Sequence, residues 1–336
     1  MGKGRGVTGP ISLLFAFCFL LSRVEEAMTS VKVLSILLLA VTLAGCVGTV
    51  PPTGTSPGNQ GPGRKFIIEE KLVRTEGPFQ LWRVLYWSRD KNGRPVKTTA
   101  KVYRPTDTSV KRPGLIWNHG GWNQCTSLRQ LFKYAELGYV VIGADYQGCD
   151  GLGEPDYLGT EINDVLGTLD WLKSHPEFVD VTKIYMVGHS LGGAITLRTL
   201  DTLPDLGRVR EIKAAVVQAT VYSENRAYKE EKNQEIRTEL MEKYHLSDQE
   251  VQALKRSRSP DMPQNHDKVA VPIFIAHGTA DTYVPPDHSK LLAADLAKMG
   301  VKHKLKLYPG ARHTFDEPQL SEYLRDCQIW FQENSR

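Results

Sequence analysis

The sequence has few of the residues on which several classes of site depend. Its 336 residues include only five cysteines and nine histidines, and no Cys/His spacing resembles a zinc site. A His-Glu-x-x-His motif is absent, so no metal site is predicted. The net charge is +4, and removing residues 1–45, which carry four Lys/Arg and two Asp/Glu, leaves about +2. Because both signs are spread along the chain, a nucleic-acid partner is not expected.

Long apolar runs are also lacking. The two longest, residues 11–21 and 33–45, stop short of the ~18 residues that a membrane span requires. The second run follows Lys32 and ends in Leu-Ala-Gly-Cys at Cys46, which is typical of a signal peptide. This ending resembles a bacterial lipobox, which implies lipidation at Cys46 and a chain anchored in the membrane of the cell envelope. The alternative is a plain secretory signal and a secreted protein.

Residues 1–64 divide into segments of different composition. Met28 starts a complete signal peptide by itself, so we expect residues 1–27 to be an over-called extension and 28–45 to be the lipoprotein signal peptide. Residues 46–64 are rich in Pro and Gly, which predicts a flexible tether. Folded sequence is expected over 65–336, as one domain.

That domain opens with strands and then alternates strands with helices. Residues 65–74 and 80–89 indicate strands, and Asn92-Gly93 indicates a hairpin turn before a third strand at 98–105. Apolar strand candidates then alternate with helical stretches such as 161–175, where apolar residues recur at helical spacing. This pattern predicts an α/β fold, with an antiparallel opening and a mostly parallel sheet covered on both faces. Six strand candidates make up that second part: 114–118, 139–145, 183–188, 212–219, 272–278 and 303–308.

Residues 223–262 interrupt this alternation with a charged helical insertion. They contain "ENRAYKEEKNQEIRTELMEKYHLSDQEVQALKRSRS". Two interpretations stay open, a solvated excursion on the surface and a small lid over the substrate pocket.

"GHSLGG" at residues 188–193 places Ser190 between a strand candidate and a helix candidate. This strand–turn–helix context is what a nucleophile elbow needs, since a sharp turn lifts the serine hydroxyl into the cleft. In that context, helix N–H groups, including that of Leu191, face the negative charge that develops during the reaction. Ser190 is therefore the candidate nucleophile.

A serine nucleophile needs a base, and the base needs a carboxylate that orients it. In this kind of fold the acid and then the histidine follow the serine along the chain, each just after a strand. Asp281 follows the strand candidate at 272–278, and His313 follows the one at 303–308. The predicted catalytic set is therefore Ser190, Asp281 and His313. His277, before Gly278 at a strand end, is interpreted as structural.

"IWNHGGWNQ" follows the first parallel strand, where acyl transfer needs a second oxyanion donor. A pair of glycines lets the backbone approach the substrate closely. We assign this role to the backbone N–H of Gly121 or of Trp122, beside that of Leu191. Trp122 is alternatively a wall of the pocket.

Several of these motifs occur together in an order that resembles a known superfamily. "HGGW", "DYQGCDG", "GHSLGG", "HGTADTYVP" and "YPGARHTF" resemble the α/β-hydrolase superfamily, and within it the catalytic domain of prolyl-oligopeptidase-like (S9-type) serine peptidases and their esterase relatives. The resemblance implies a serine hydrolase that needs no cofactor, and it implies that Asp145 and Tyr146 lie beside the cleft. Gln147 stands where the family usually has Arg.

Two further expectations rest on this resemblance. The strands before Cys125 and Cys149 are neighbours in the resembled fold, and disulfides persist in exported proteins, so a Cys125–Cys149 disulfide that braces the oxyanion loop is expected. Two buried free thiols are the alternative. About 70 residues separate Cys46 from Ile116, too few for the amino-terminal propeller of the oligopeptidases, since one blade takes about 40.

The predicted function is therefore a serine hydrolase that cleaves ester bonds of small substrates through an acyl-enzyme. One alternative is an S9-like peptidase that acts on short peptides or aminoacyl bonds. Another is an acyltransferase that keeps the triad but excludes water. An alternative from a different class is a non-catalytic binding protein at the cell surface with a hydrolase fold.

Overall fold

The computed structural model describes residues 66–122, 124–224 and 230–335. The predicted extension at 1–27, the signal peptide at 28–45 and the tether at 46–64 lie outside the described residues, and so does Cys46. In the described part of the chain, no helix has the length and apolarity needed to cross a membrane.

The described part contains nine strands and seven α-helices, together with three short 3₁₀ turns. The strands are β1 Ile67–Glu76, β2 Phe79–Arg89, β3 Pro95–Pro105, β4 Arg112–Asn118, β5 Val140–Ala144, β6 Val179–His189, β7 Ala214–Gln218, β8 Ile273–Gly278 and β9 His303–Tyr308. The helices are α2 Leu128–Glu136, α3 Glu161–Lys173, α4 Leu191–Thr202, α5 Glu230–Tyr244, α6 Asp248–Arg258, α7 Asp287–Lys298 and α8 Gln319–Glu333. The 3₁₀ turns are η1 Cys149–Gly151, η2 Val209–Glu211 and η3 Pro263–Asn265.

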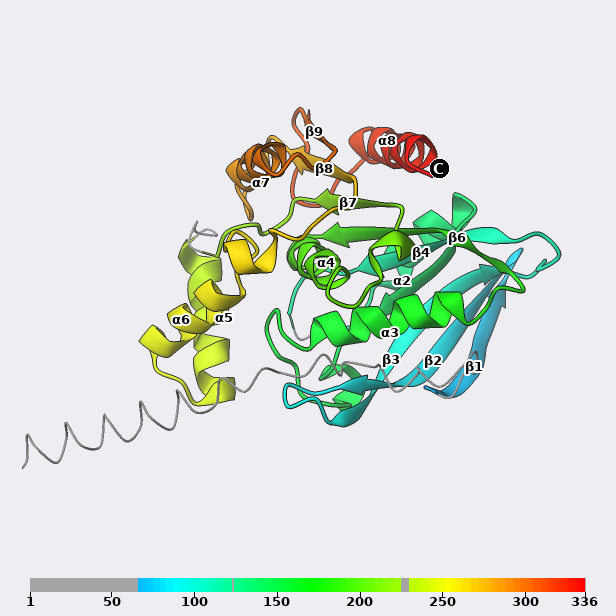
Figure 1. Ribbon diagram of the computed structural model, residues 1–336, viewed down its shortest axis with the longest axis horizontal. Helices are drawn as coiled ribbons and strands as arrows, with labels where there is room; N and C mark the ends of the chain where they lie inside the picture. The colour runs from blue at the N-terminus through cyan, green and yellow to red at the C-terminus, as the bar shows by residue number, and fades with distance from the viewer. Residues whose placement is uncertain (1–65, 123, 225–229, 336) are drawn as a thin grey trace, which may run out of the picture. The chain divides into compact units, whose positions relative to one another are not determined.

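All nine strands form one sheet in the order β1-β2-β3-β5-β4-β6-β7-β8-β9 (Figure 1). The pairs β1–β2, β2–β3 and β3–β5 are antiparallel, and every pair from β5 to β9 is parallel. The predicted α/β class, with its antiparallel opening, is thereby confirmed. β6 begins earlier than predicted, because Val179 and Asp180 already pair with Arg112 and Pro113 of β4.

The central strands are buried on both faces, and successive side chains enter different cores. Ile116, Ile142 and Met186 belong to one core cluster, whereas their neighbours Leu115 and Tyr185 belong to the other. This alternation explains why the strand sequences are apolar almost throughout, since neither face meets water.

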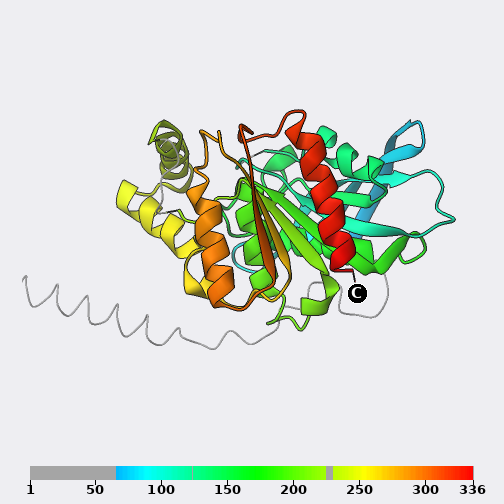
Figure 2. The ribbon, with the colours of Figure 1, turned by 90° about the horizontal axis from the view of Figure 1, so that it is seen from above.

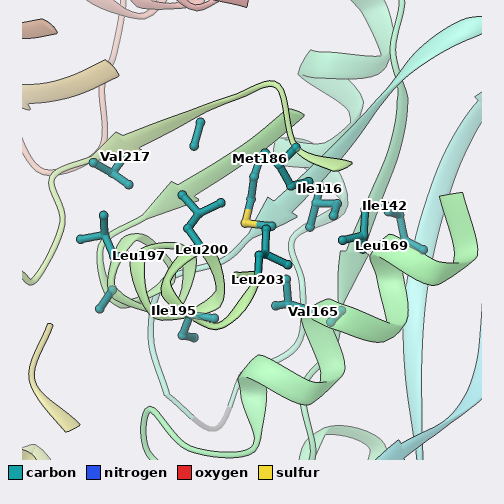
Figure 3. Packing of buried hydrophobic residues seen from close by; sticks show 14 of the residues in the cluster. Ile116, Ile142, Val165, Leu169, Met186, Ile195, Leu197, Leu200, Leu203 and Val217 are labelled. Carbon is teal, nitrogen blue, oxygen red and sulfur yellow. The ribbon is translucent and has the colours of Figure 1, made fainter. Parts of the chain in front are cut away.

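Helices cover each face of the sheet. In the first core, α3 contributes Val165 and Leu169, and α4 contributes Leu197 and Leu200, against the strand residues (Figure 3). In the second core, α2 and α8 supply aromatic and aliphatic side chains, among them Tyr134, Tyr323, Cys327, Trp330 and Phe331. Seen from above, α7 and α8 flank the β8–β9 end of the sheet from opposite sides (Figure 2).

The charged insertion forms two helices, α5 and α6, that are attached to the domain by buried polar contacts. Lys255 of α6 pairs at 3.2 Å with Glu224, at the start of the insertion, and both side chains are almost fully buried. Glu224 in turn accepts a hydrogen bond from the Tyr157 hydroxyl of the domain. Arg258 pairs with Asp156 at 2.7 Å, and the Tyr244 hydroxyl of α5 donates to the carbonyl of Pro155. These contacts fix the insertion at three points.

Replacing Lys255 with Met tests this attachment. The variant leaves the Glu224 carboxylate buried without its cation, and burial already raises the Glu224 pKa. Because an isolated buried charge is strongly unfavourable, we expect a loss of about 3–5 kcal/mol in the free energy of unfolding, measured with urea at pH 7.

The control for this variant is Lys268→Met, which removes an exposed pair with Asp205. Its effect should be much smaller, because water screens exposed pairs. If the Lys255 variant is as stable as the Lys268 variant, the buried Lys255–Glu224 pair does not stabilise the fold. A Lys255→Met, Glu224→Gln double variant should recover part of the lost stability, because it also removes the buried negative charge.

Candidate active site

Ser190 occupies the sharp turn between β6 and α4. Its backbone has φ 56° and ψ −123°, a conformation that non-glycine residues rarely adopt. The backbone N–H of Ser190 donates to the carbonyl of Gln218 at the end of β7, and its carbonyl accepts from Gly193. These bonds hold the turn, so that the side chain stands at the carboxyl end of the sheet, as an elbow requires.

Close backbone packing around the turn explains the surrounding glycines. A Cβ atom on Gly188 would lie 2.3 Å from the carbonyl oxygen of Gly192, and one on Gly192 would lie 2.1 Å from that of Asn118. Neither position has room for a side chain. The first turn of α4 therefore packs directly on the ends of β4 and β6.

The three predicted catalytic residues meet at this place. His313 Nε2 lies 2.9 Å from Ser190 Oγ, and His313 Nδ1 lies 2.7 Å from Asp281 Oδ2. Because a carboxylate only accepts hydrogen bonds, Nδ1 carries the proton and Nε2 is left to accept the Ser190 hydroxyl proton. The arrangement can therefore activate the serine as a nucleophile.

The Asp281 carboxylate is fixed by contacts at both of its oxygens. Oδ1 accepts from the backbone N–H groups of Tyr283 and Val284, and Oδ2 faces both His313 and His277, the latter at 3.2 Å. Burial by itself raises the pKa of Asp281, but the hydrogen bonds from His277, His313 and Val284 outweigh it and hold the pKa well below its ordinary value.

His277 contributes to the site by supporting Asp281. Its Nε2 lies 2.9 Å from the carbonyl oxygen of Val284, and its Nδ1 lies 2.7 Å from Ser289 Oγ. Since the carbonyl only accepts, Nε2 carries the proton, which also points toward Asp281 Oδ2. The sequence assigned His277 a structural role without linking it to the acid. The spacing of four residues between them was the available signal.

His189 supports the other side of the catalytic histidine. Its Nε2 lies 3.1 Å from the backbone carbonyl oxygen of His313, and the two rings lie 4.8 Å apart. Burial, followed by the charge of His313, lowers the pKa of His189 to about 4. The ring is therefore neutral at pH 7 and donates a hydrogen bond that holds the His313 backbone.

The glycine pair after β4 lies beside the nucleophile. A Cβ atom on Gly120 would lie 2.8 Å from Ser190 Cβ, so of the two glycines it is Gly120 that packs against the nucleophile. Gly121 has φ +72°, and a side chain there would collide with Gln124. Both glycines, together with Trp122 and Leu191, line the same cavity as Ser190. The sequence singled out Gly121 and Trp122 in this loop but not Gly120.

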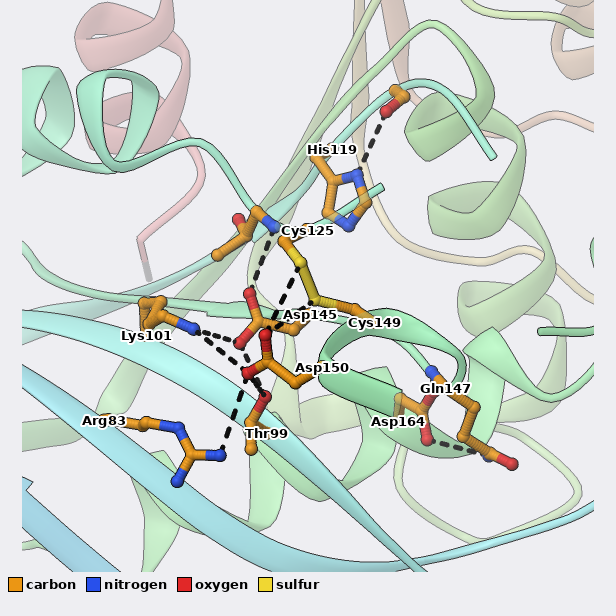
Figure 4. Close-up of a disulfide and its surroundings, with 12 residues drawn as sticks. Arg83, Thr99, Lys101, His119, Cys125, Asp145, Gln147, Cys149, Asp150 and Asp164 are labelled. Atoms are coloured by element: carbon orange, nitrogen blue, oxygen red, sulfur yellow. Dashed lines mark hydrogen bonds and ion pairs between the residues drawn. A yellow bond between two sulfur atoms is a disulfide. The ribbon is translucent and has the colours of Figure 1, made fainter. Parts of the chain in front are cut away.

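A disulfide joins the oxyanion loop to the loop that follows β5 (Figure 4). Cys125 and Cys149 are bonded, with Cα atoms 5.5 Å apart. Below the bond, Asp145 accepts hydrogen bonds from the Thr126 backbone N–H and from Lys101 Nζ. The loops that follow β4 and β5 are therefore tied by the disulfide and by the Thr126–Asp145 hydrogen bond, and Lys101 of β3 adds an ion pair to Asp145. Cys327 is free and buried in α8.

The other residues of the "DYQGCDG" loop lie behind the cavity. Asp145 is fully buried, and Tyr146 stacks on His119 with ring centroids 4.2 Å apart, so neither belongs to the described residues that line the cavity. Gln147 is also buried: its backbone and side-chain N–H groups donate to Asp164, and the side chain also donates to the carbonyl of Arg89. Gln147 therefore connects the loop to α3 and β2.

A cavity of about 350 Å³ opens above Ser190. Besides the elbow and the oxyanion loop, its walls include Tyr157, Ile236 of α5, Tyr283 and Val284. Sequence patterns alone did not identify these wall residues, because they come from three segments that only the fold brings together. Asp, Glu, Lys and Arg are absent from the described lining.

A metal is not accommodated by the residues near the cavity that could bind one. In the described part of the chain, Cys125, Asp145 and Cys149 have ligand atoms within 4.8 Å of one another. The disulfide removes both thiolates, which are the form of cysteine that binds metals. Asp145 already accepts from Lys101 and Thr126.

The sheet, the elbow and the Ser–His–Asp geometry define an α/β-hydrolase fold with a site of the serine-hydrolase type. A model of the prolyl oligopeptidase family matches residues 126–336, more than half of the chain, and the chain belongs to that family.

Individual relatives agree with this assignment. The chain is 26% identical over 244 residues to human dipeptidyl peptidase 8, covering 66% of this chain and 25% of the relative. It is 27% identical over 244 residues to acylamino-acid-releasing enzyme 1 of Oryza sativa subsp. japonica, covering 67% of this chain and 30% of the relative. The chain thus spans less than a third of either relative. The solved structure of brefeldin A esterase, a bacterial homologue of human hormone sensitive lipase, superposes with a TM-score of 0.58 at 19% identity. The superposition covers 80% of this chain and 81% of the esterase.

The disulfide is open to a direct chemical test. Cys125 and Cys149 are 24 residues apart in sequence, and a cross-link of that span stabilises a fold by about 3 kcal/mol. We expect a double Cys→Ser variant to lose about that much in urea unfolding. In the parent protein, denatured without reductant, a peptide map should show Cys327 alkylated and these two cysteines unmodified. Alkylation of both before reduction would contradict the bond.

The low pKa of Asp281 predicts how its contribution to stability depends on pH. Its folded pKa lies below the unfolded value, so its contribution is full at neutral pH and declines as the pH falls below about 4. The difference in unfolding free energy between the parent and Asp281→Asn should therefore narrow from pH 7 to pH 3. Asp267→Asn, at an exposed carboxylate, is the control. If the stability difference between the parent and Asp281→Asn is the same at pH 7 and pH 3, the Asp281 carboxylate does not contribute to stability in this way.

Proposed function

We propose that this protein is a serine hydrolase that cleaves ester bonds of small, uncharged acyl substrates. The observation that carries the proposal is the continuous contact from Ser190 Oγ through His313 to Asp281 Oδ2, at 2.9 and 2.7 Å. A binding protein has no need of such a chain of contacts. Serine acyl transfer depends on it, because the hydroxyl is a poor nucleophile without a base.

The reaction proceeds in two half-reactions. His313 Nε2 takes the proton of Ser190 as Oγ attacks the carbonyl carbon, and the backbone N–H groups of Leu191 and of Gly121 or Trp122 stabilise the oxyanion. The ester C–O bond then breaks, and the leaving alcohol receives the proton from His313. Water repeats the sequence on the acyl-enzyme and releases the acid. Asp281 stays ionised and stabilises the imidazolium.

The neutral lining of the cavity favours an ester with an uncharged acyl group. An enzyme that releases amino acids or dipeptides from a free amino terminus must hold its ammonium group, and a desolvated cation needs a carboxylate partner. The described walls offer aromatic, aliphatic and neutral polar side chains instead. A peptidase acting on short peptides or aminoacyl bonds is the second candidate, favoured by the names of two relatives, dipeptidyl peptidase 8 and acylamino-acid-releasing enzyme 1.

Comparing Ser190→Ala with the parent protein tests the proposal. Because removing a nucleophile removes the covalent step, we expect p-nitrophenyl butyrate hydrolysis to fall at least about 10³-fold. A fluorophosphonate probe should label the parent at Ser190 and leave the variant unlabelled. Ser321→Ala, at an exposed serine of α8, should retain both activity and labelling.

The choice between the two candidates rests on substrates. Alanyl and prolyl p-nitroanilides are measured beside the ester series on the same preparation. Faster turnover of the anilides would replace the ester assignment with the peptidase one, whereas an unlabelled and inactive parent protein would exclude both. Transfer of the acyl group to added alcohol in preference to water would identify an acyltransferase.

We also propose that Cys46 is lipidated and anchors the protein in the bacterial cell envelope. The Leu-Ala-Gly-Cys ending of the apolar run supports this proposal. Expressed in a bacterium, the full chain should partition into detergent and incorporate an alkyne-tagged fatty acid, and Cys46→Ser should do neither. If the full chain and Cys46→Ser partition alike and neither incorporates the fatty acid, only the interpretation as a plain secretory signal remains.

A further inference from the structure

The Trp122 side chain connects the oxyanion loop to the helical insertion. Its ring lines the cavity, beside Tyr157 and Ile236 of α5. The indole N–H donates to the Glu239 carboxylate of α5, and Lys243, one helical turn further on, lies 5.8 Å from the ring centroid. A residue directly after the glycine pair is thus held by the insertion.

The two aromatic walls at this end of the cavity differ in how firmly they are held. Tyr157 is fully buried, and its hydroxyl donates to Glu224, itself paired with Lys255. Its backbone N–H donates to Tyr244, and its carbonyl accepts from Arg258. Tyr157 is therefore fixed from several sides.

Trp122, by comparison, is only half-buried. It meets Tyr157 edge to face at 6.0 Å and lies 6.4 Å from Tyr244, and its polar group is held by Glu239, an exposed side chain. Of the two rings, Trp122 is the more exposed, and its indole N–H is held by a side chain at the surface. The Trp122–Glu239 contact is thus the adjustable part of this wall.

The chemistry of the site determines which part of the substrate meets this wall. His313 must return its proton to the leaving group, so the leaving group lies toward His313, where Tyr283 stands 5.4 Å away and Thr314 follows. The acyl group then extends toward the remaining walls, which include Trp122, Tyr157 and Ile236. These side chains are apolar over most of their surface, so they suit a hydrocarbon chain.

We propose that Trp122, held by Glu239, closes the acyl end of the cavity and sets the longest acyl chain that the enzyme accepts. This inference rests on the ester-hydrolase function proposed above and adds the substrate class, short uncharged acyl groups. Releasing or removing the indole opens the cavity toward α5 and admits longer chains, while the triad stays in place.

The test measures kcat/KM for p-nitrophenyl esters from acetyl to decanoyl. The quantity compared is the ratio of the decanoyl to the butyryl value, because a ratio cancels effects common to all substrates. Trp122→Ala removes the wall, Trp122→Phe keeps a ring without the N–H donor, Glu239→Ala removes the acceptor, and Glu239→Gln keeps an acceptor oxygen. Glu242→Ala, at another exposed carboxylate of α5, is the matched control.

We expect Trp122→Ala to raise the ratio by at least about tenfold, since each methylene accommodated in an apolar pocket changes specificity by that order. Glu239→Ala and Trp122→Phe should raise it by a smaller and similar factor, and combining them should add nothing, because both remove the same contact. Glu239→Gln and Glu242→Ala should keep the parent ratio. In a second series, with a fixed butyryl group and alcohols of increasing length, the dependence of kcat/KM on alcohol length should be the same in the parent and in all five variants.

Three results would overturn the inference: an unchanged ratio in Trp122→Ala, a shift confined to the alcohol series, or additive effects of Glu239→Ala and Trp122→Phe. Thermal unfolding of each variant is recorded, and if Trp122→Ala does not fold, Trp122→Phe and Glu239→Ala decide the question. If the parent hydrolyses esters but the Trp122 and Glu239 variants keep its acyl-length profile, only this inference is rejected. A parent without Ser190-dependent turnover on any ester rejects the proposed function as well.

Discussion

The site depends on the strained backbone of Ser190. A positive φ at a non-glycine residue has a free-energy penalty of about 1–3 kcal/mol and persists only when its surroundings determine it. Here β6 and α4 meet with so little space that Gly188 and Gly192 could not carry side chains, and β7 binds the Ser190 N–H. The tight packing of the buried central strands thus holds the serine hydroxyl outside the core.

The second constraint is electrostatic and lies at the other end of the triad. A buried carboxylate is unfavourable unless its oxygens are occupied, and Asp281 satisfies both through two backbone N–H groups, His313 and His277. His277 is in turn oriented by Ser289 of α7. The helix that follows the acid therefore helps to hold it, so the triad is supported by β8, β9 and α7 together.

These contacts also explain which features the sequence could predict. Strand positions, the elbow and the order of Ser190, Asp281 and His313 follow from periodicity and motifs, because each is a local pattern. The Cys125–Cys149 pairing required the further knowledge that β4 and β5 are neighbours, which came from a family resemblance. Gly120, Tyr157 and Ile236 could not be found in this way: their roles depend on distances between segments, and residues 223–262 show no pattern that distinguishes a wall from a solvated helix.

The structure separates the groups that perform the chemistry from those that select the substrate. The triad stands at the ends of β6, β8 and β9, where the sheet and two cores leave no freedom. The apolar walls come from the oxyanion loop, the 155–160 loop and α5, which meet through polar contacts such as Tyr244–Pro155 and Trp122–Glu239. A change in the insertion can therefore reshape the cavity without moving Ser190 or His313. The disulfide limits how far such a change spreads, because it ties the base of the oxyanion loop to β5 while leaving the Trp122 ring facing α5.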